Sequence, residues 1–245
     1  MILKEVQLTN SQDPKIRAGE DAEKQMAFYL QRAFGKAKDL YILNDLTIVY
    51  DGDAAQIDHL IVSQFGLFIV ESKSVHGTIS INKQKEWSRT YNKPLGMRSP
   101  VLQAEAQGKI LRALLRANSE KLLSKVLGLL QKGFKFCPIN VFAAIPDSDI
   151  INRETTISEL FKADRITDAI DEKLKVLKKS NSLLSLTSND VAWSINAEET
   201  KNALKVIENC SQYSIGKFVF RKKKTEFFGC SQYPKCNFTS YRNNV

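Results

Sequence analysis

The sequence predicts an α/β or α+β protein in which helices flank a mixed central sheet, with a small β-ribbon module at the C-terminal end. The first observation is the order of the predicted elements: a helix, several short strands, a helix, a strand and further helices. The second is composition, since 43% hydrophobic and 26% charged residues are ordinary for a soluble globular chain. The third is an abrupt change to basic and aromatic residues from about Lys205 onward.

The residue pattern of the first half of the chain predicts one helix followed by a series of strands. Apolar residues recur at helical spacing from Gly19 to Phe34, and acidic residues fill the first turn of that segment. Short runs rich in β-branched and aromatic residues then predict strands at 41–43, 46–50, 57–62 and 67–70, and shorter ones at 78–81 and 86–90. Turn-forming residues at 51–53 and 63–66 separate the longer runs.

The second half predicts mainly helices. Ser99-Pro100 opens a helix from Val101 to Leu115, and a helical stretch continues to Leu130. We expect a buried strand at 140–145, one or two helices at 157–179, and a connector rich in Ser and Asn at 180–189.

The positive charge is concentrated near the C-terminus. The formal net charge is +9, and from Lys205 onward eight lysines and arginines oppose Glu208 and Glu226, a net +6. We therefore predict a main domain at 1–200 and a basic module at 205–245. Excess positive charge favours polyanions such as nucleic acids, because each neutralised phosphate releases counterions. The alternative is that the charge only keeps the protein soluble.

The sequence predicts no association with membranes. No run approaches the roughly 18 uninterrupted apolar residues that a membrane-spanning helix needs. The first residues also lack the basic and apolar pattern of a secretory signal. We therefore expect a cytoplasmic protein.

Two carboxylates are predicted to face each other across a hairpin. The strands at 57–62 and 67–70 flank a turn centred between Gln64 and Phe65. If the hairpin is symmetric about that centre, Asp58 lies directly opposite Glu71, with Cβ atoms about 4.5–5.5 Å apart. Lys73 is two residues beyond Glu71 and therefore projects from the same face.

Such a pair needs a compensating cation, because like charges directly opposite each other destabilise a sheet. Mg²⁺, or Mn²⁺ in its place, suits one or two carboxylates together with water and phosphate oxygens. A bound metal polarises a phosphate and lowers the pKa of its water, and Lys73 would orient that water or stabilise charge on the phosphate. The alternative is that Asp58 caps a strand while Glu71 and Lys73 form a surface ion pair. These residues interrupt strands apolar enough to be buried on both faces, which favours a functional site.

Three segments in this order resemble the nuclease-related domain (NERD), a branch of the PD-(D/E)XK phosphodiesterases. They are GEDAE at 19–23, QIDHLIVSQFGLFIVESKSVHGTI at 56–79 and SPVLQAEAQ at 99–107, and the resemblance covers roughly residues 15–130. It implies a restriction-endonuclease-like fold with a four- or five-stranded mixed sheet flanked by helices. It also implies that Asp58 and Glu71 ligate the metal, that Lys73 assists catalysis, and that Glu23 and Gln103 border the site.

The residues themselves leave the roles of Glu23 and Gln103 open. Glu23 lies on the inward face of its predicted helix, where the helix dipole alone would favour a carboxylate by about 0.3–1 kcal/mol. Gln103 is either a site residue or an amide on the helix surface. The chain departs from the family at Ser99, where Asn is frequent, and at Gln107, where His is frequent. Both histidines of the chain lack a His or Cys at ligand spacing and are expected to be structural.

The basic C-terminal segment resembles the zinc-ribbon repeats of bacterial type IA topoisomerases. Residues 227–236 read FFGCSQYPKC, close to the signature F-x-G-C-S-x-Y-P-x-C, but Tyr213 replaces the second cysteine of the expected CxxC pair. Only Cys210, Cys230 and Cys236 remain as ligands in this segment, whereas a structural zinc site takes four N or S ligands. We therefore predict a metal-free ribbon held together by aromatic residues.

We expect this module to bind nucleic acid, in particular single-stranded DNA, because aromatic rings stack on bases while cations contact phosphates. The cations expected to do so are Lys217, Arg221, Lys222, Lys223, Lys224 and Lys235. The alternative is that the aromatic residues form a small core and the lysines a solvated turn.

The sequence thus predicts a Mg²⁺-dependent nuclease that hydrolyses phosphodiester bonds of DNA during DNA processing. The alternative is a non-catalytic DNA-binding protein that keeps a nuclease-like fold. The resemblance adds the expectation of a homodimer, since isolated PD-(D/E)XK domains often need two copies to cut both strands.

Overall fold

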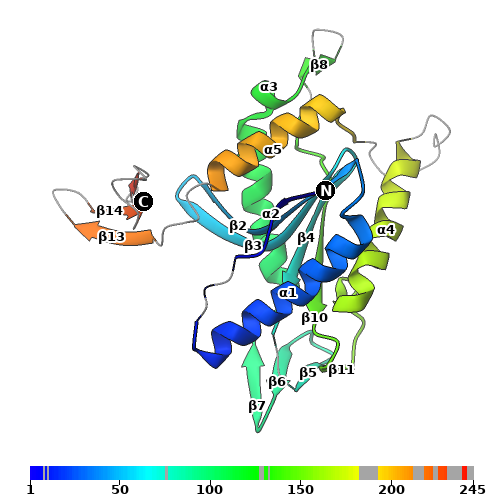
Figure 1. Cartoon of the computed structure of the whole chain (residues 1–245), viewed down its shortest axis with the longest axis vertical. Helices are drawn as coiled ribbons and strands as arrows, with labels where there is room; N and C mark the ends of the chain where they lie inside the picture. The colour runs from blue at the N-terminus through cyan, green and yellow to red at the C-terminus, as the bar shows by residue number, and fades with distance from the viewer. Residues whose placement is uncertain are drawn as a thin grey trace.

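The computed structural model describes residues 1–7, 9, 11–74, 77–126, 130–131, 133–181, 193–211, 218–222, 226–230 and 239–241 (Figure 1). Its helices are α1 (Pro14–Phe34), α2 (Pro100–Ala117), α3 (Ser119–Leu122), α4 (Ala163–Ser180) and α5 (Ala197–Ser211). The strands of the first half are β1 (Ile2–Lys4), β2 (Leu40–Tyr50), β3 (Asp53–Ser63), β4 (Gly66–Ser72), β5 (Thr78–Ile81), β6 (Trp87–Thr90) and β7 (Pro94–Met97). Those of the second half are β8 (Lys125–Val126), β9 (Leu130–Gln131), β10 (Ile139–Ile145), β11 (Ile150–Arg153), β12 (Leu160–Lys162), β13 (Phe218–Lys222), β14 (Glu226–Cys230) and β15 (Thr239–Tyr241).

The centre of the protein is a six-stranded mixed sheet in the order β1-β2-β3-β4-β10-β12. β2, β3 and β4 form an antiparallel meander, while β1, β10 and β12 each pair in parallel with a neighbour. The predicted mixed sheet flanked by helices is therefore confirmed. The resemblance implied four or five strands, and the structure has six because three-residue strands, β1 and β12, add one to each edge.

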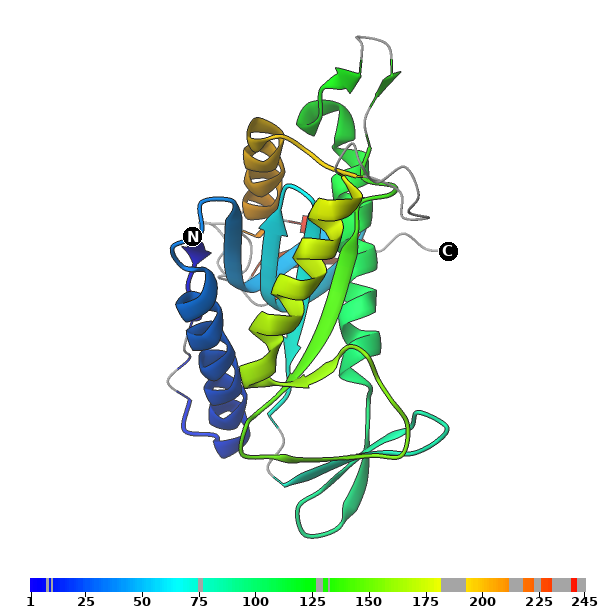
Figure 2. The same ribbon diagram turned by 90° about the vertical axis from the view of Figure 1, so that its right-hand side faces the viewer.

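Helices cover both faces of this sheet, as Figure 2 shows for α1 and α2 on opposite sides of it. α2 and α5 bury apolar residues such as Leu111 and Ile207 against one face, in a core with Leu60 and Ile69. α1 and α4 bury theirs against the other face, around Phe68. The strands β3 and β4 are buried on both faces for this reason, which explains why their sequence is apolar without alternation.

α2 lies over the sheet because it is part of the crossover from β4 to the parallel strand β10. Ser99 caps its N-terminus, where the Ser99 Oγ accepts a hydrogen bond from Leu102 N at 3.3 Å, and Pro100 occupies the first helical position. Gly108 allows the helix close to the sheet, because a Cβ there would lie 3.3 Å from Ile139 Cγ2. The crossover thus brings the first turns of α2 to the C-terminal end of β4.

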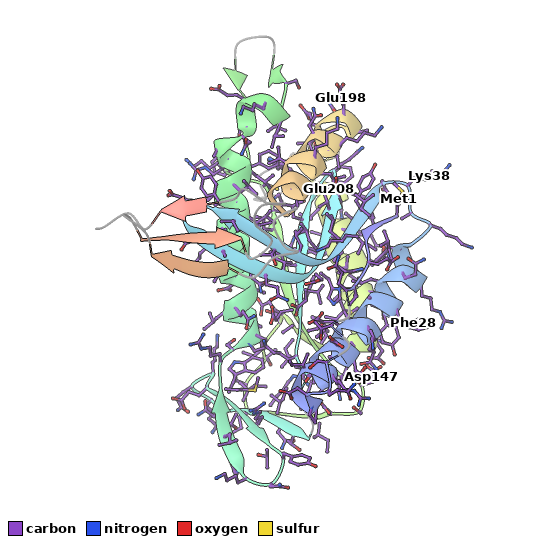
Figure 3. All side chains as sticks on the ribbon, turned by 60° about the vertical axis from the view of Figure 1, so that its left-hand side comes forward. Met1, Phe28, Lys38, Asp147, Glu198 and Glu208 are labelled. Carbon is purple, nitrogen blue, oxygen red and sulfur yellow. The ribbon has the colours of Figure 1, made fainter. Side chains whose placement is uncertain are left out.

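Asp147, just after β10, joins three elements at the same end of the sheet. Its Oδ2 accepts hydrogen bonds from Tyr29 Oη at 2.6 Å and Gln25 Nε2 at 3.1 Å, and its Oδ1 accepts one from Asp164 N at 3.1 Å. Figure 3 shows Asp147 next to α1. These bonds fix the middle of α1, close to Glu23, relative to the central sheet.

A second sheet, in the order β11-β5-β6-β7, extends from the lower end of the protein in Figures 1 and 2. We call residues 78–98, which contain β5, β6 and β7, the β-arm. Ile79, Ile81 and Trp87 attach its inner face to a small core that includes Ile145 of β10. The strands predicted at 78–81 and 86–90 are confirmed, and β7 and β11 were not predicted.

Several predicted boundaries differ from the structure. α1 begins at Pro14 rather than Gly19, because a proline is favourable at the first helical position and Gly19 is tolerated inside the helix. The strands predicted at 41–43 and 46–50 are one strand, β2. The helical stretch predicted to reach Leu130 is wrong, since it ends at Leu122 and is followed by β8 and β9. The helix predicted from residue 157 begins at Ala163, because 160–162 pair with β10 as an edge strand.

α5 runs across the boundary that was predicted near Lys205. Asn196 and Glu199 form a capping box at its start: Glu199 N donates to Asn196 Oδ1 at 2.8 Å, and Asn196 N donates to Glu199 Oε2 at 2.9 Å. Leu204 and Ile207 then belong to the main core. The division into a main domain and a C-terminal module stays a prediction.

β13, β14 and β15 form a separate antiparallel sheet, in agreement with the β-structure expected near the C-terminus. Lys217, Lys223, Lys224, Lys235 and Cys236 lie outside the described residues. Only the backbone is described for Arg221, Lys222, Cys210 and Cys230. None of the helices in the described part of the chain combines the length and the hydrophobicity that a membrane-spanning segment requires.

Candidate functional site

The β3–β4 hairpin has the predicted register. His59 pairs with Val70, and the same register continues to Ser63 and Gly66, so the next position outward places Asp58 opposite Glu71. Both carboxylates are buried, with 8% of Asp58 and 2% of Glu71 exposed. Asp58 Oδ2 accepts a hydrogen bond from Ser72 N at 2.8 Å, which ties it to the end of β4.

On its other side, β3 pairs with β2 in a single register that is interrupted at Asp45 and Asp58. Asp45 has a φ of 49°, in the left-handed region, which removes it from the ladder. Irregular pairing of this kind re-aims side chains and is frequent next to active sites. The interruption therefore leaves Asp58 free of β2 and directed to the end of β4.

Lys73 and two glutamines of α2 surround the Glu71 carboxylate. Lys73 Nζ donates to Glu71 Oε1 at 2.6 Å and to Gln103 Oε1 at 3.0 Å. Gln107 Nε2 donates to Glu71 Oε2 at 2.8 Å and to the carbonyl oxygen of Gln56 at 2.6 Å. Gln103 and Gln107 are one helical turn apart, so both reach the same carboxylate region. The structure thus brings together Asp58, Glu71, Lys73 and Gln103.

Glu23 approaches this group from α1 and is electrostatically coupled to it. Burial raises the pKa of Glu23 to about 7, and the negative charges of Asp45 and Glu71 act in the same direction. Burial likewise raises the pKa of Asp58 well above its usual value, with further contributions from Glu71 and Glu23. The site therefore holds more carboxyl groups than Lys73 alone can neutralise, and the metal-free protein disfavours their full ionisation.

A row of uncharged side chains, Asn44, His59 and Ser72, crosses β2, β3 and β4 beside the carboxylates. His59 Nδ1 and Asn44 Oδ1 lie 2.8 Å apart, and His59 Nε2 and Ser72 Oγ lie 3.1 Å apart. Burial lowers the pKa of His59 to about 3, so the ring is neutral at physiological pH. The other histidine, His76, lies outside the described residues.

The donor set fits a divalent cation that is bound partly through water. Among the described residues, no three His, Cys, Asp or Glu side chains are placed to hold a metal ion together. Asp58 and Glu71 offer hard oxygen ligands, however, and Mg²⁺ is commonly held by one or two carboxylates while it keeps several waters. Gln107 Oε1 is buried there without a hydrogen-bond partner in the part of the chain that is described, which is consistent with a missing polar neighbour.

Comparison with known proteins identifies the family. The nuclease-related domain matches residues 18–142, just over half of the 245 residues.

The chain belongs to the nuclease-related domain family.

The matched range of the nuclease-related domain contains every residue of the site described above. An uncharacterized protein of Bacillus anthracis is 34% identical over 77 residues, which are 31% of this chain and 34% of that protein. The chain thus matches about a third of the length of this relative. No solved structure matches the chain.

Two polar residues of this nuclease-related domain site did not enter the sequence-based prediction as site residues. Gln107 was noted only as a departure from the family, although its spacing of four residues from Gln103 was a usable signal. Asp45 gave no such signal, because its placement depends on the positive φ that breaks the β2–β3 pairing.

Proposed function

We propose that this protein is a metal-dependent phosphodiesterase of the PD-(D/E)XK type that hydrolyses DNA. The observation that carries the proposal is the pair of buried carboxylates at the end of a hairpin, with Lys73 Nζ 2.6 Å from Glu71 Oε1. A buried pair of like charges is costly without a cation. Membership of a nuclease-related family supports the same reaction class.

Asp58 and Glu71 would hold Mg²⁺ or Mn²⁺. When bound, the ion would polarise a phosphate oxygen and lower the pKa of a coordinated water. Asp58 is positioned for this by Ser72 N, and Glu71 by Gln107 Nε2. Gln107 therefore acts as a positioning residue, because it orients a ligand rather than contacting the substrate.

Lys73 would supply a further positive charge beside the reacting phosphate. Its bonds to Glu71 and Gln103 hold the ammonium beside the carboxylates, where it stabilises negative charge that develops on the phosphate. Glu23, with a pKa of about 7, is able to accept a proton near neutral pH. Glu23 and Gln103 are thus proposed to border the site.

One observation favours the alternative, a DNA-binding protein that does not cleave. Both oxygens of Glu71 already accept hydrogen bonds, one from Lys73 and one from Gln107. The negative charge of Glu71 is therefore already compensated by Lys73 without a metal ion. A protein of this kind would retain DNA in a salt-sensitive manner but would not cut it with any divalent metal.

The basic C-terminal segment is proposed to add affinity for DNA through Lys217, Arg221, Lys222, Lys223, Lys224 and Lys235. The support is compositional, namely the net +6 from Lys205 onward. We propose that the segment does so without zinc, since Tyr213 stands at one of four ligand positions.

The test is cleavage of circular single-stranded and supercoiled double-stranded DNA in Mg²⁺ or Mn²⁺. Wild type is expected to cut and Lys73→Met to lose activity by about 10²-fold or more, as the removal of an electrostatic stabiliser does elsewhere. Lys175→Met, which removes an exposed lysine of α4 paired with Asp171, is the matched control and should cut like wild type. If wild type binds DNA and cuts neither circle, the non-catalytic alternative replaces the proposal.

A further inference from the structure

In the sequence, the β-arm lies between the two segments that carry the candidate site. These segments are the β3–β4 hairpin with Lys73 and the helix α2 with Gln103. It starts at Thr78, five residues after Lys73, and it ends at Arg98, directly before the Ser99 cap of α2. α2 in turn carries Gln103, which accepts a hydrogen bond from Lys73 Nζ. Each end of the β-arm is therefore joined through a few residues to a side chain of the site.

The turn between β6 and β7 lies close to the start of the β-arm, which is the end nearest to Lys73 in the sequence. Gly77 packs against it so tightly that a Cβ there would lie 2.3 Å from Thr90 O and 3.5 Å from Tyr91 Cα. Gly77 is four residues beyond Lys73, so their Cα atoms are at most about 14 Å apart. One strand of duplex DNA carries a phosphate about every 3.4 Å along the axis, and this distance therefore corresponds to a few nucleotides.

Positive charge dominates the surface of the β-arm. Five exposed cations oppose a single carboxylate, Glu86, whose Oε2 accepts a hydrogen bond from Asn82 Nδ2 at 2.6 Å. The cations are Lys83, Lys85, Arg89, Lys93 and Arg98. Within the described residues, none of them forms an ion pair with a carboxylate.

Four exposed cations elsewhere in the described part of the protein do have such partners. Ion pairs join Lys24 to Asp21 at 3.3 Å, Arg165 to Asp168 at 3.4 Å, Lys175 to Asp171 at 2.6 Å and Lys178 to Asp39 at 3.1 Å. The β-arm differs from the chain as a whole in its balance of charge, since five cations oppose one carboxylate here and 36 cations oppose 27 carboxylates overall. This local excess leaves the cations available to an external polyanion.

The β-arm also presents an aromatic ring to solvent. Tyr91 is 76% exposed and lies in the same turn as Lys93, and Leu95 of β7 is 48% exposed. A ring so exposed is not part of a core, and one placed among cations suits stacking on an unpaired base. The turn between β5 and β6 is held rigid by Asn82, whose Oδ1 accepts hydrogen bonds from Gln84 N at 3.0 Å and Glu86 N at 2.9 Å.

We propose that the β-arm binds the DNA strand next to the scissile phosphate, with its five cations on phosphates and Tyr91 stacked on an unpaired base. The inference rests on the proposed function, since it takes DNA as the substrate of the same site. It goes further by assigning the β-arm a preference for single-stranded segments, because a base stacked inside a duplex does not offer its face to a side chain.

The experiment compares two variants of the full chain that each lose four positive charges. One removes cations of the β-arm: Lys83→Gln, Lys85→Gln, Arg89→Gln and Lys93→Gln. The matched control removes paired cations: Lys24→Gln, Arg165→Gln, Lys175→Gln and Lys178→Gln. Affinity for labelled single-stranded and duplex DNA is measured over a range of salt in Ca²⁺, which takes the same oxygen ligands. Cleavage is measured separately in Mg²⁺ at saturating DNA.

For single-stranded DNA, the slope of log affinity against log salt should be smaller in magnitude by about 3 in the β-arm variant than in wild type. In the control variant this slope should change little. Tyr91→Leu should weaken single-strand binding by about tenfold and duplex binding much less. Equal slopes in the two charge variants, or a β-arm variant that binds like wild type, would overturn the inference. Cleavage by wild type would in that case still support the proposed nuclease activity. Binding that depends on the β-arm without any cleavage would support the inference and remove the proposed activity. If the β-arm bound a protein partner and no DNA, this result would also overturn the inference.

Discussion

Glu23 shows how one residue links the charge of the site to the stability of the fold. Its pKa of about 7 exceeds the ordinary value of 4.5, so the folded protein binds a proton that the unfolded chain releases between these pH values. The stability contributed by this proton is present below pH 4.5 and is lost as the pH rises to about 7. Glu23 thus destabilises the metal-free protein at neutral pH.

We predict that Glu23→Gln removes part of this dependence. In urea unfolding between pH 5 and 8 without divalent cations, wild type should lose more stability with rising pH than Glu23→Gln. The control, Glu172→Gln on the exposed side of α4, should follow wild type. Equal pH dependence in wild type and Glu23→Gln would show that Glu23 is not coupled to the carboxylates.

The residues of the hairpin were the most predictable part of the site. Asp58, Glu71 and Lys73 are close in sequence, and the symmetric turn alone fixed which of them face each other. Gln107 was harder to assign, because an amide gives no charge signal and its two bonds join α2 to β3 and β4. Asp45 was inaccessible to sequence reasoning, since its role follows from a backbone conformation that no local pattern indicates.

At the scale of elements, long segments could be predicted, and of the short ones β5 and β6 were found while most others were missed. β3, β4, α2 and most of α1 carry enough apolar residues to show their period. β1, β7 and β12 have three or four residues each and exist because a neighbouring strand pairs with them. The segment after α3 was misassigned as helix, because Leu-rich runs are compatible with either state when they are short.

The attachment of the β-arm gives a prediction at this scale. Gly77 has a φ of 114°, which side chains rarely adopt, and a Cβ there would collide with Thr90 O. Gly77→Ala should destabilise the protein by about 1–3 kcal/mol and weaken DNA binding, because the β-arm must shift.

The matched control is Gly96→Ala in β7 of the same sheet. A Cβ at Gly96 meets no atom within 4 Å, so this substitution should change stability by less than about 0.5 kcal/mol. Urea unfolding of both variants measures the difference. Similar stability for the two would mean that Gly77 does not constrain the junction.

At the scale of the whole molecule, the site should behave as a switch between a strained metal-free state and a relaxed metal-bound state. Asp58 has a raised pKa because it is buried beside Glu71 and Glu23, so its ionisation opposes folding. A cation that binds only the folded protein adds stability of about 2.7 kcal/mol at 100 times its dissociation constant.

Asp58→Asn is therefore predicted to melt at a higher temperature than wild type without metal, and to lack the rise in melting temperature that we expect Mg²⁺ to give wild type. Asp53→Asn, an exposed carboxylate at the start of β3, should keep that rise. Thermal unfolding with and without Mg²⁺ measures both. A rise of the same size in Asp58→Asn and wild type would place the metal elsewhere.

The short edge strands have a consequence for how copies of this protein meet. A sheet edge recruits another chain by offering a long row of unpaired N–H and C=O groups, and this is how amyloid and swapped oligomers begin. Here β1 and β12 close the central sheet with three residues each, and β7 opens with Pro94, which has no N–H to donate. Continuous strand addition is thus suppressed at these edges. A homodimer that cuts both strands of DNA is thus expected to form through side chains rather than by pairing of these edges, and the protein should stay dispersed at concentrations at which open-edged sheets aggregate.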